Sequence, residues 1–150
     1  MITFYGPDGE KVENPSDEFI KEFTNKEADY WQQGSGDSSF EADNCDEVLI
    51  IFYEEPYGFL ILRHPDYLVP YDENKNNESV EHDVGGEPMA VPACSFVSRE
   101  DAYKIITEYV KKQKFSKKYN WTDLYEIDFD GNDYWLYNVS IKLVNDTSYI

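Results

Sequence analysis

The clearest structural signal in the chain lies in residues 85–121, which read GGEPMAVPACSFVSREDAYKIITEYVKKQKFSKKYNW. Ser98 is a favoured helix N-cap residue, and the two acidic residues after Arg99 suit the positive end of a helix dipole. Apolar side chains then recur with helical spacing in a single stripe: Ala102, Ile105, Ile106, Tyr109 and Val110. Lys111 and Lys112 follow, as expected near the negative end of the dipole. The pattern predicts an amphipathic helix that begins after Ser98.

The segments that flank this helix are less regular. A glycine pair and a short extended segment precede it, and a basic loop leads from it to Trp121. Trp121 has two interpretations: it packs the helix onto a sheet, or it is an anchor in a partner interface. The only basic patch of the sequence lies here, at Lys104, Lys111, Lys112, Lys114, Lys117 and Lys118. We interpret these lysines as the solvated side and end of a helix, or as partners of the chain's own acidic loops, in preference to an anion or nucleic-acid site.

The N-terminal part predicts one strand and one short helix. Residues 2–5 form the strand, and Gly6-Pro7-Asp8-Gly9 is the turn that ends it. The helix begins with either Asn14 or Ser16 as its cap, and Phe19, Ile20 and Phe23 form its apolar edge.

A loop is predicted at residues 34–39. Its two glycines suggest a phosphate loop, but the third glycine of that motif is missing, so we interpret the segment as a flexible connection.

The middle of the chain predicts a meander. Residues 48–53 and 59–62 are apolar on both faces, which is typical of central strands with both sides covered. Residues 54–58 join them as a hairpin loop. Residues 67–71 form a further strand, where Pro70 indicates a sheet edge or a strand end. The polar residues 72–84 predict a mobile surface loop.

A C-terminal hairpin is predicted over residues 123–143. Apolar and acidic residues alternate from Tyr125 to Phe129, and a second alternating run follows Gly131. A three-residue loop at 129–131 puts both apolar sets on one face, because it pairs residue 127 with 133 and residue 125 with 135.

These elements run in blocks and do not alternate strictly, which predicts an α+β fold. We expect one domain over residues 1–150, with an antiparallel sheet of roughly five to seven strands and two helices packed on it. The chain has 150 residues and is 17% aromatic, so it can bury a substantial core.

The formal net charge is −18, and it is unevenly distributed. Residues 1–87 contain 22 Asp or Glu and 5 Lys or Arg, whereas residues 88–150 contain 9 and 8. An acidic surface repels nucleic acid and anionic membranes, and it attracts basic proteins with fast, salt-sensitive association. Taken alone, the charge favours a solubilising surface, which is common in bacterial proteins.

No pattern in the sequence indicates an enzyme, a cofactor or a metal site. Asp128 to Asn132 resembles part of a calcium loop, but Tyr137 stands where the bidentate carboxylate is needed. His64 and His82 lack the spacing of zinc ligands, and Cys45 and Cys94 are expected to be reduced thiols in the cytoplasm. No signal peptide or membrane span is predicted.

The stretch described first also resembles a known family. Gly85-Gly86-Glu87, then Val97-Ser98-Arg99-Glu100 opening a helix, then Lys111 to Lys118 leading into Trp121, resemble the immunity proteins of bacterial polymorphic toxin systems. The similar group is paired with deaminase toxins, including the double-stranded-DNA cytosine deaminase. The resemblance is strongest over residues 85–124 and extends loosely back to about residue 16. It implies an α+β protein that binds and silences a toxin.

We therefore expect a cytoplasmic immunity protein, monomeric when free, that occludes the active site of a toxin with a basic substrate-binding face. The residues expected to contact the toxin are Glu54, Glu55, Asp72, Glu73, Glu78, Glu81, Asp83 and Trp121. The alternatives are an acidic DNA mimic that inhibits a nuclease or restriction complex, and a structural scaffold module.

Overall fold

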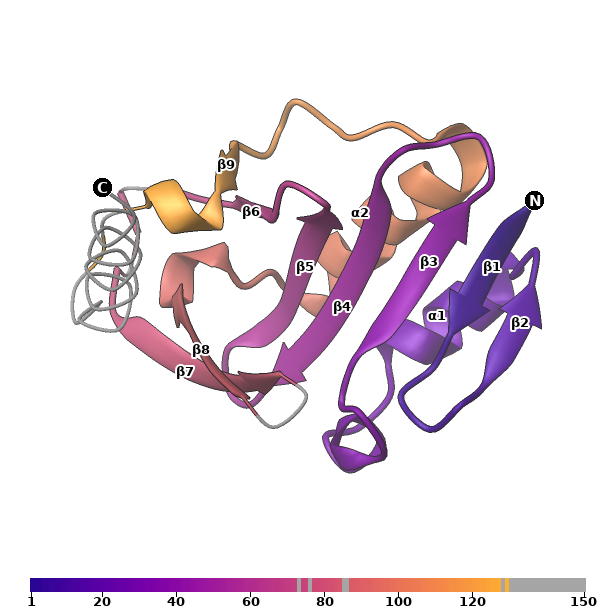
Figure 1. The fold of residues 1–150 in the computed structure, drawn as a ribbon, viewed down its shortest axis with the longest axis horizontal. Coiled ribbons are helices and arrows are strands. Elements are labelled where there is room, and N and C mark those ends of the chain that lie inside the picture. The colour runs from indigo at the N-terminus through magenta and orange to yellow at the C-terminus, as the bar shows by residue number, and fades with distance from the viewer. Residues whose placement is uncertain (73, 76, 85–86, 128, 130–150) are drawn as a thin grey trace, which may run out of the picture.

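The computed structural model describes residues 1–72, 74–75, 77–84, 87–127 and 129 (Figure 1). Its centre is a seven-stranded antiparallel sheet in the order β2-β1-β3-β4-β5-β6-β9. These strands are β1 (Ile2–Tyr5), β2 (Lys11–Glu13), β3 (Ser38–Ala42), β4 (Val48–Glu54), β5 (Gly58–His64), β6 (Leu68–Pro70) and β9 (Trp121–Asp123). The predicted α+β fold is confirmed.

The remaining elements pack on this sheet. Strands β7 (Ser79–Val84) and β8 (Glu87–Pro92) form a separate two-stranded sheet. The α-helices of the described residues are α1 (Asp17–Thr24) and α2 (Arg99–Lys112). Three short 3-10 helices complete the described elements: η1 (Tyr30–Gln32), η2 (Ala93–Ser95) and η3 (Leu124–Glu126).

Both faces of the two central strands are covered, as predicted. One face, with Phe59 and Ile61 of β5, is buried against α1 and α2. The opposite face, with Leu60 and Leu62, is buried against β8 and the residues that follow β9. Figure 1 shows both helices behind the sheet and the β7–β8 pair at its other side. The continuous apolar runs of β4 and β5 follow from this burial on two sides.

Helix α2 begins and ends as its sequence predicts. The Ser98 hydroxyl accepts a hydrogen bond from the Asp101 amide (3.1 Å), and Gln113 ends the helix in the left-handed conformation. Tyr109 is fully buried; its hydroxyl donates to the Glu47 carbonyl (2.7 Å) and accepts from the Ala42 amide (3.0 Å). Tyr109 therefore fastens α2 to the connection between β3 and β4.

The cap of α1 is Ser16, whose hydroxyl accepts from the Phe19 amide (3.1 Å). Asn14, the alternative cap, has a different role. It lies just after β2 with φ of 50°, and its side chain accepts from the Ile2 amide (3.1 Å). The sequence analysis did not predict β2, which pairs with β1 through only three residues.

Two predicted loops are wrong in part. Within residues 72–84, Ser79–Val84 forms β7, because Val80 and His82 point inward while Glu81 is exposed. Within residues 34–39, Ser38 and Ser39 belong to β3, where Ser38, Phe40 and Ala42 alternate inward. In both segments the polar composition concealed a two-residue periodicity. Pro70 is predicted to mark either a sheet edge or a strand end. It marks a strand end, because β6 lies between β5 and β9 and is not at the edge of the sheet.

The start of the predicted C-terminal hairpin differs from the structure. Leu124–Glu126 is a 3-10 helix, capped by the Asp123 carboxylate, which accepts from the Tyr125 amide (2.9 Å). Ile127 and Phe129 are buried beneath the face of the sheet opposite the helices. The predicted pairing of residues 125 and 127 with 135 and 133 falls outside the described residues.

Candidate functional site

A hollow of about 400 Å3 lies where β4 ends, and we call it the acidic hollow. Its lining residues are Ala28, Trp31, Gln32, Gly34, Ser35, Gly36, Tyr53, Glu54, Glu55 and His82. They come from three separate parts of the chain: the segment around η1, the end of β4 with its following turn, and β7. Two of the residues predicted to contact a partner, the consecutive Glu54 and Glu55, thus line the same hollow.

Strand alternation places the side chains around this hollow. Tyr53 points to the helical face of the sheet, where its ring lies 6.2 Å from that of Trp31. Glu54 points to the opposite face and reaches β7. Glu55 follows in the turn to β5 and is exposed. The hollow therefore lies at the end of the sheet, where the two faces meet.

Glu54 and His82 form a contact between the two sheets. The Glu54 Oε2 atom lies 2.6 Å from Nδ1 of His82, whose side chain is 8% exposed. A carboxylate accepts hydrogen bonds, so Nδ1 carries the proton in this contact. The imidazole edge also meets the ring of Phe52 (5.0 Å between centroids). The Nε2 atom is buried and has no hydrogen-bond partner among the residues that the structure describes.

Glu55 belongs to a second network on the helical side. The Tyr53 hydroxyl donates to Oε1 of Glu55 (2.5 Å) and accepts from the Arg99 guanidinium (3.2 Å). Burial and the hydrogen bond with Glu55 raise the pKa of Tyr53, so the phenol remains protonated at neutral pH. Arg99 also donates to the carbonyls of Thr24 and Lys26 (2.7 and 2.8 Å), which joins the two α-helices at the rim of the hollow.

Gly34 holds the remaining wall in place. Its φ is +49°, and a Cβ atom there would lie 1.8 Å from the Pro7 carbonyl oxygen. The Ser35 amide donates to the same carbonyl (2.9 Å). The glycines at 34 and 36, the latter also with positive φ, thus allow a turn that packs against the β1–β2 connection.

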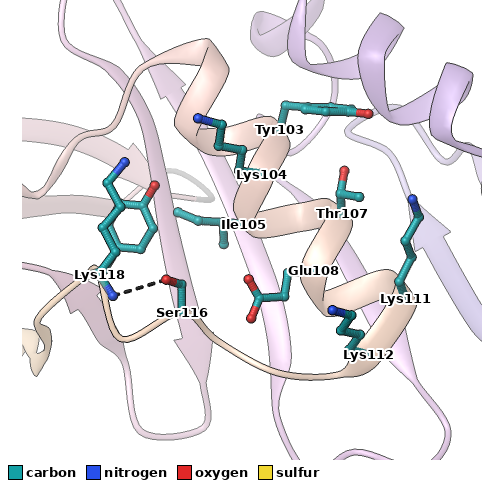
Figure 2. Close-up of a pocket in the computed structure, with 10 residues that line it drawn as sticks. Tyr103, Lys104, Ile105, Thr107, Glu108, Lys111, Lys112, Ser116 and Lys118 are labelled. Atoms are coloured by element: carbon teal, nitrogen blue, oxygen red, sulfur yellow. Dashed lines mark hydrogen bonds between the residues drawn. The ribbon is translucent and has the colours of Figure 1, made fainter.

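The basic patch lies elsewhere, beside α2 (Figure 2). A groove of about 380 Å3 runs between the helix and the segment that follows it; its lining residues are Tyr103, Lys104, Ile105, Thr107, Glu108, Lys111, Lys112, Ser116, Lys118 and Tyr119. Three of the lysines contact the chain's own carboxylates: Lys104 with Glu100 (3.1 Å), Lys111 with Asp17 (3.0 Å) and Lys118 with Asp101 (3.4 Å). These lysines thus pair internally, but with carboxylates of α1 and of the first turn of α2, whereas the sequence predicts pairing with the acidic loops.

Asp101 is the best-connected carboxylate of that region. It accepts from the Tyr119 hydroxyl (2.7 Å), and the hydrogen bonds from Tyr119, Lys118 and Ser98 hold the pKa of its carboxyl below the usual value. Burial and the same hydrogen bond raise the pKa of Tyr119. The arrangement fixes the segment after α2 against the start of the helix.

The other residues predicted to contact a partner are dispersed. Asp72 lines a separate hollow of about 620 Å3, together with Cys94 and Tyr119. Glu78 and Glu81 are exposed at β7. Glu73 and the side chain of Asp83 lie outside the described residues. The sequence analysis missed Trp31, Tyr53 and His82 as site residues; only the alternation in β7 could have indicated the last of them.

Trp121 packs inside the molecule. It is half-buried in β9, and its ring lies 5.4 Å from that of Phe115 and 6.1 Å from that of Tyr119. The guanidinium of Arg63 lies 5.2 Å from its ring centre. The tryptophan thus contributes to the core beneath α2, which is the packing role considered for it.

No cluster of three or more metal-ligating side chains occurs within the described part of the chain. No helix that the structure describes is both long and apolar enough to cross a membrane. Comparisons with known proteins gave no match, whether to models of protein families, to curated proteins or to solved structures.

Proposed function

We propose that this chain is an immunity protein that binds a toxin made by the same bacterial cell and occludes its active site. The toxin is a nucleic-acid deaminase in this proposal, and the protein acts in the cytoplasm as a monomer. The proposal rests on the sequence resemblance over residues 85–124 and on the distribution of charge.

The observation that carries the proposal is the acidic hollow itself. Glu54 and Glu55 lie side by side at the end of β4. They belong to residues 1–87, which contain 22 acidic and 5 basic residues. Many other carboxylates of this part, such as Glu18, Glu22 and Glu41, are exposed. A surface of this kind complements the basic groove in which a nucleic-acid-modifying enzyme holds its substrate.

Inhibition then requires no chemistry from this protein. The acidic surface accelerates encounter with the toxin, and the hollow with its aromatic wall supplies the close contact that excludes the nucleic acid. Tyr53 contributes apolar area, while the carboxylates repel the phosphate backbone of competing substrate.

A titration tests the proposal. The proposal expects a toxin gene directly upstream in the same genome, and the probe is the purified toxin domain of that gene, assayed for deamination of DNA at fixed concentration. We expect activity to fall linearly with added protein to an endpoint at one molar equivalent. Complete inhibition at well below one equivalent would contradict stoichiometric binding. Full deaminase activity together with inhibition of a nuclease would favour the DNA-mimic alternative.

A further inference from the structure

We infer that the acidic hollow binds the guanidinium group of an arginine side chain presented by the partner. The identity of that partner as a toxin rests on the proposed function, whereas the chemistry of the ligand follows from the wall of the hollow.

Each carboxylate at the hollow has one oxygen in use. Glu54 holds His82 through Oε2, and Glu55 accepts from the Tyr53 hydroxyl through Oε1. The second oxygen of each has no partner within the described ranges. Two carboxylate oxygens from adjacent residues thus remain as acceptors at the mouth of the hollow, and charge-assisted hydrogen bonds are the strongest that such oxygens make.

Two of the side chains that line the hollow, His82 and Trp31, each have a buried ring nitrogen without a partner in the residues that the structure describes, which is independent evidence for a ligand. His82 uses Nδ1 for the contact with Glu54, and its buried Nε2 has no hydrogen-bond partner among the residues described. Trp31 is 4% exposed, and its indole N–H likewise has no acceptor in the described part of the chain. Leaving such groups unpaired and away from water is unfavourable, so a ligand that pairs with them gains affinity.

The shape of the site favours guanidinium over ammonium. A guanidinium is planar, offers several N–H donors at once and stacks on aromatic rings, whereas an ammonium is a compact and strongly hydrated charge. The hollow offers the half-buried ring of Tyr53 next to the two carboxylates. The carboxylate acceptors and this ring thus match the planar group.

Arg63 shows this combination of a carboxylate and an aromatic ring within the chain itself, whereas Arg99 lies on an aromatic ring without a carboxylate. Arg63 donates two hydrogen bonds to Glu47 (2.6 and 2.5 Å) while its guanidinium lies 3.8 Å from the Phe115 ring centre. Arg99 lies 5.0 Å from the ring centre of Tyr53 and is already bonded to two carbonyls and to the Tyr53 hydroxyl. The arginine beside the hollow is therefore occupied, which leaves the free carboxylate oxygens for a cation from outside.

The test uses the full chain and small probes followed by NMR at the Trp31 indole N–H. The probes are N-acetylarginine methylamide, its lysine counterpart, and the uncharged isostere N-acetylcitrulline methylamide. We expect a saturable shift with the arginine probe, a weaker response to lysine and none to citrulline. Glu55→Gln should weaken arginine binding about fivefold, as expected for one exposed charge pair. Glu54→Gln alone should weaken it by a larger factor.

Glu18→Gln on α1 makes the same charge change at an exposed position away from the hollow and should leave the affinity unchanged. Thermal unfolding of each variant shows whether the fold is retained. Because Glu55 is exposed, Glu55→Gln tests the inference even if Glu54→Gln is destabilised by loss of the Glu54–His82 contact. Equal responses to arginine and citrulline, or equal effects of Glu55→Gln and Glu18→Gln, would overturn the inference.

The toxin domain separates the two proposals. If the toxin binds the Glu54→Gln/Glu55→Gln variant as tightly as it binds the parent, the arginine site is wrong and the immunity function stands. If the parent does not bind the toxin but the arginine probe saturates the hollow, the immunity function is wrong and the ligand class stands.

Discussion

Arg63 and Trp121 hold each other in place on the sheet. The Arg63 guanidinium lies between the Glu47 carboxylate and the rings of Phe115 and Trp121, with both sides of the ion pair mostly buried. Trp121 could be predicted only as a packing residue or an interface anchor, because nothing near it in the sequence indicates that Arg63 lies against its ring. Its packing role depends on strand pairing between β6 and β9.

Replacing Trp121 with alanine should therefore lower the free energy of unfolding. The ring is half-buried, so the loss should be about 2–3 kcal/mol, below the usual range for a fully buried tryptophan. Urea unfolding followed by circular dichroism measures it, and Trp121→Phe should retain most of the stability. A Trp121→Ala variant that is as stable as the parent but fails to bind toxin would show that the residue is an interface anchor.

Helix α2 is the element that the sequence predicts best. Its cap, apolar stripe and terminal lysines are all local signals, and each has its expected place in the structure. Strands β2 and β7 could not be predicted in the same way. Strand β2 has three residues, and β7 contains Glu81, His82 and Asp83 in its middle, so neither shows a strong apolar run. Pairing with β1 and with β8 stabilises them, and pairing is not a local property.

Tyr109 links α2 to the sheet, and its ionisation makes the stability of the protein fall at alkaline pH. Burial raises the pKa of Tyr109 to about 12. The folded state thus retains a proton that the unfolded chain loses above pH 10. This contribution to stability is complete below pH 10 and is lost as the pH rises toward 12.

We expect the stability difference between the parent and Tyr109→Phe to shrink with rising pH. At pH 8 the variant should be less stable by about 1–3 kcal/mol, because the Ala42 amide and the Glu47 carbonyl lose their partner. At pH 11 the difference should be smaller by about 1 kcal/mol. Urea titrations at both pH values measure it. A difference that is constant between them would contradict the raised pKa.

At the scale of the whole molecule, the fold class was predictable and the assembly of the site was not. The sequence indicates that Glu54 and Glu55 are acidic residues in a turn between two strands. It does not indicate that η1 and β7 meet them there, since these contacts depend on how the two sheets pack. The other predicted contact residues were chosen by charge and exposure alone, and the structure places Asp72 in a different hollow.

The charge distribution makes a prediction at the same scale. Exposed carboxylates contribute little to stability, but together they produce a field that attracts a basic partner over about 10 Å at moderate salt. The position of a carboxylate should therefore matter for association more than for folding. Carboxylates at the hollow should have a larger effect on the rate than those on α1, because they lie where the partner docks.

Association kinetics test most directly whether the toxin docks at the acidic hollow. The measurement is stopped-flow mixing of the upstream toxin domain with the parent, with Glu54→Gln/Glu55→Gln, and with the matched Glu18→Gln/Glu22→Gln variant, at low and at physiological salt. We predict that the hollow variant associates several-fold more slowly than the matched variant at low salt, and that the gap narrows at physiological salt. Equal association rates for both variants and the parent at both salt concentrations would contradict docking at this site.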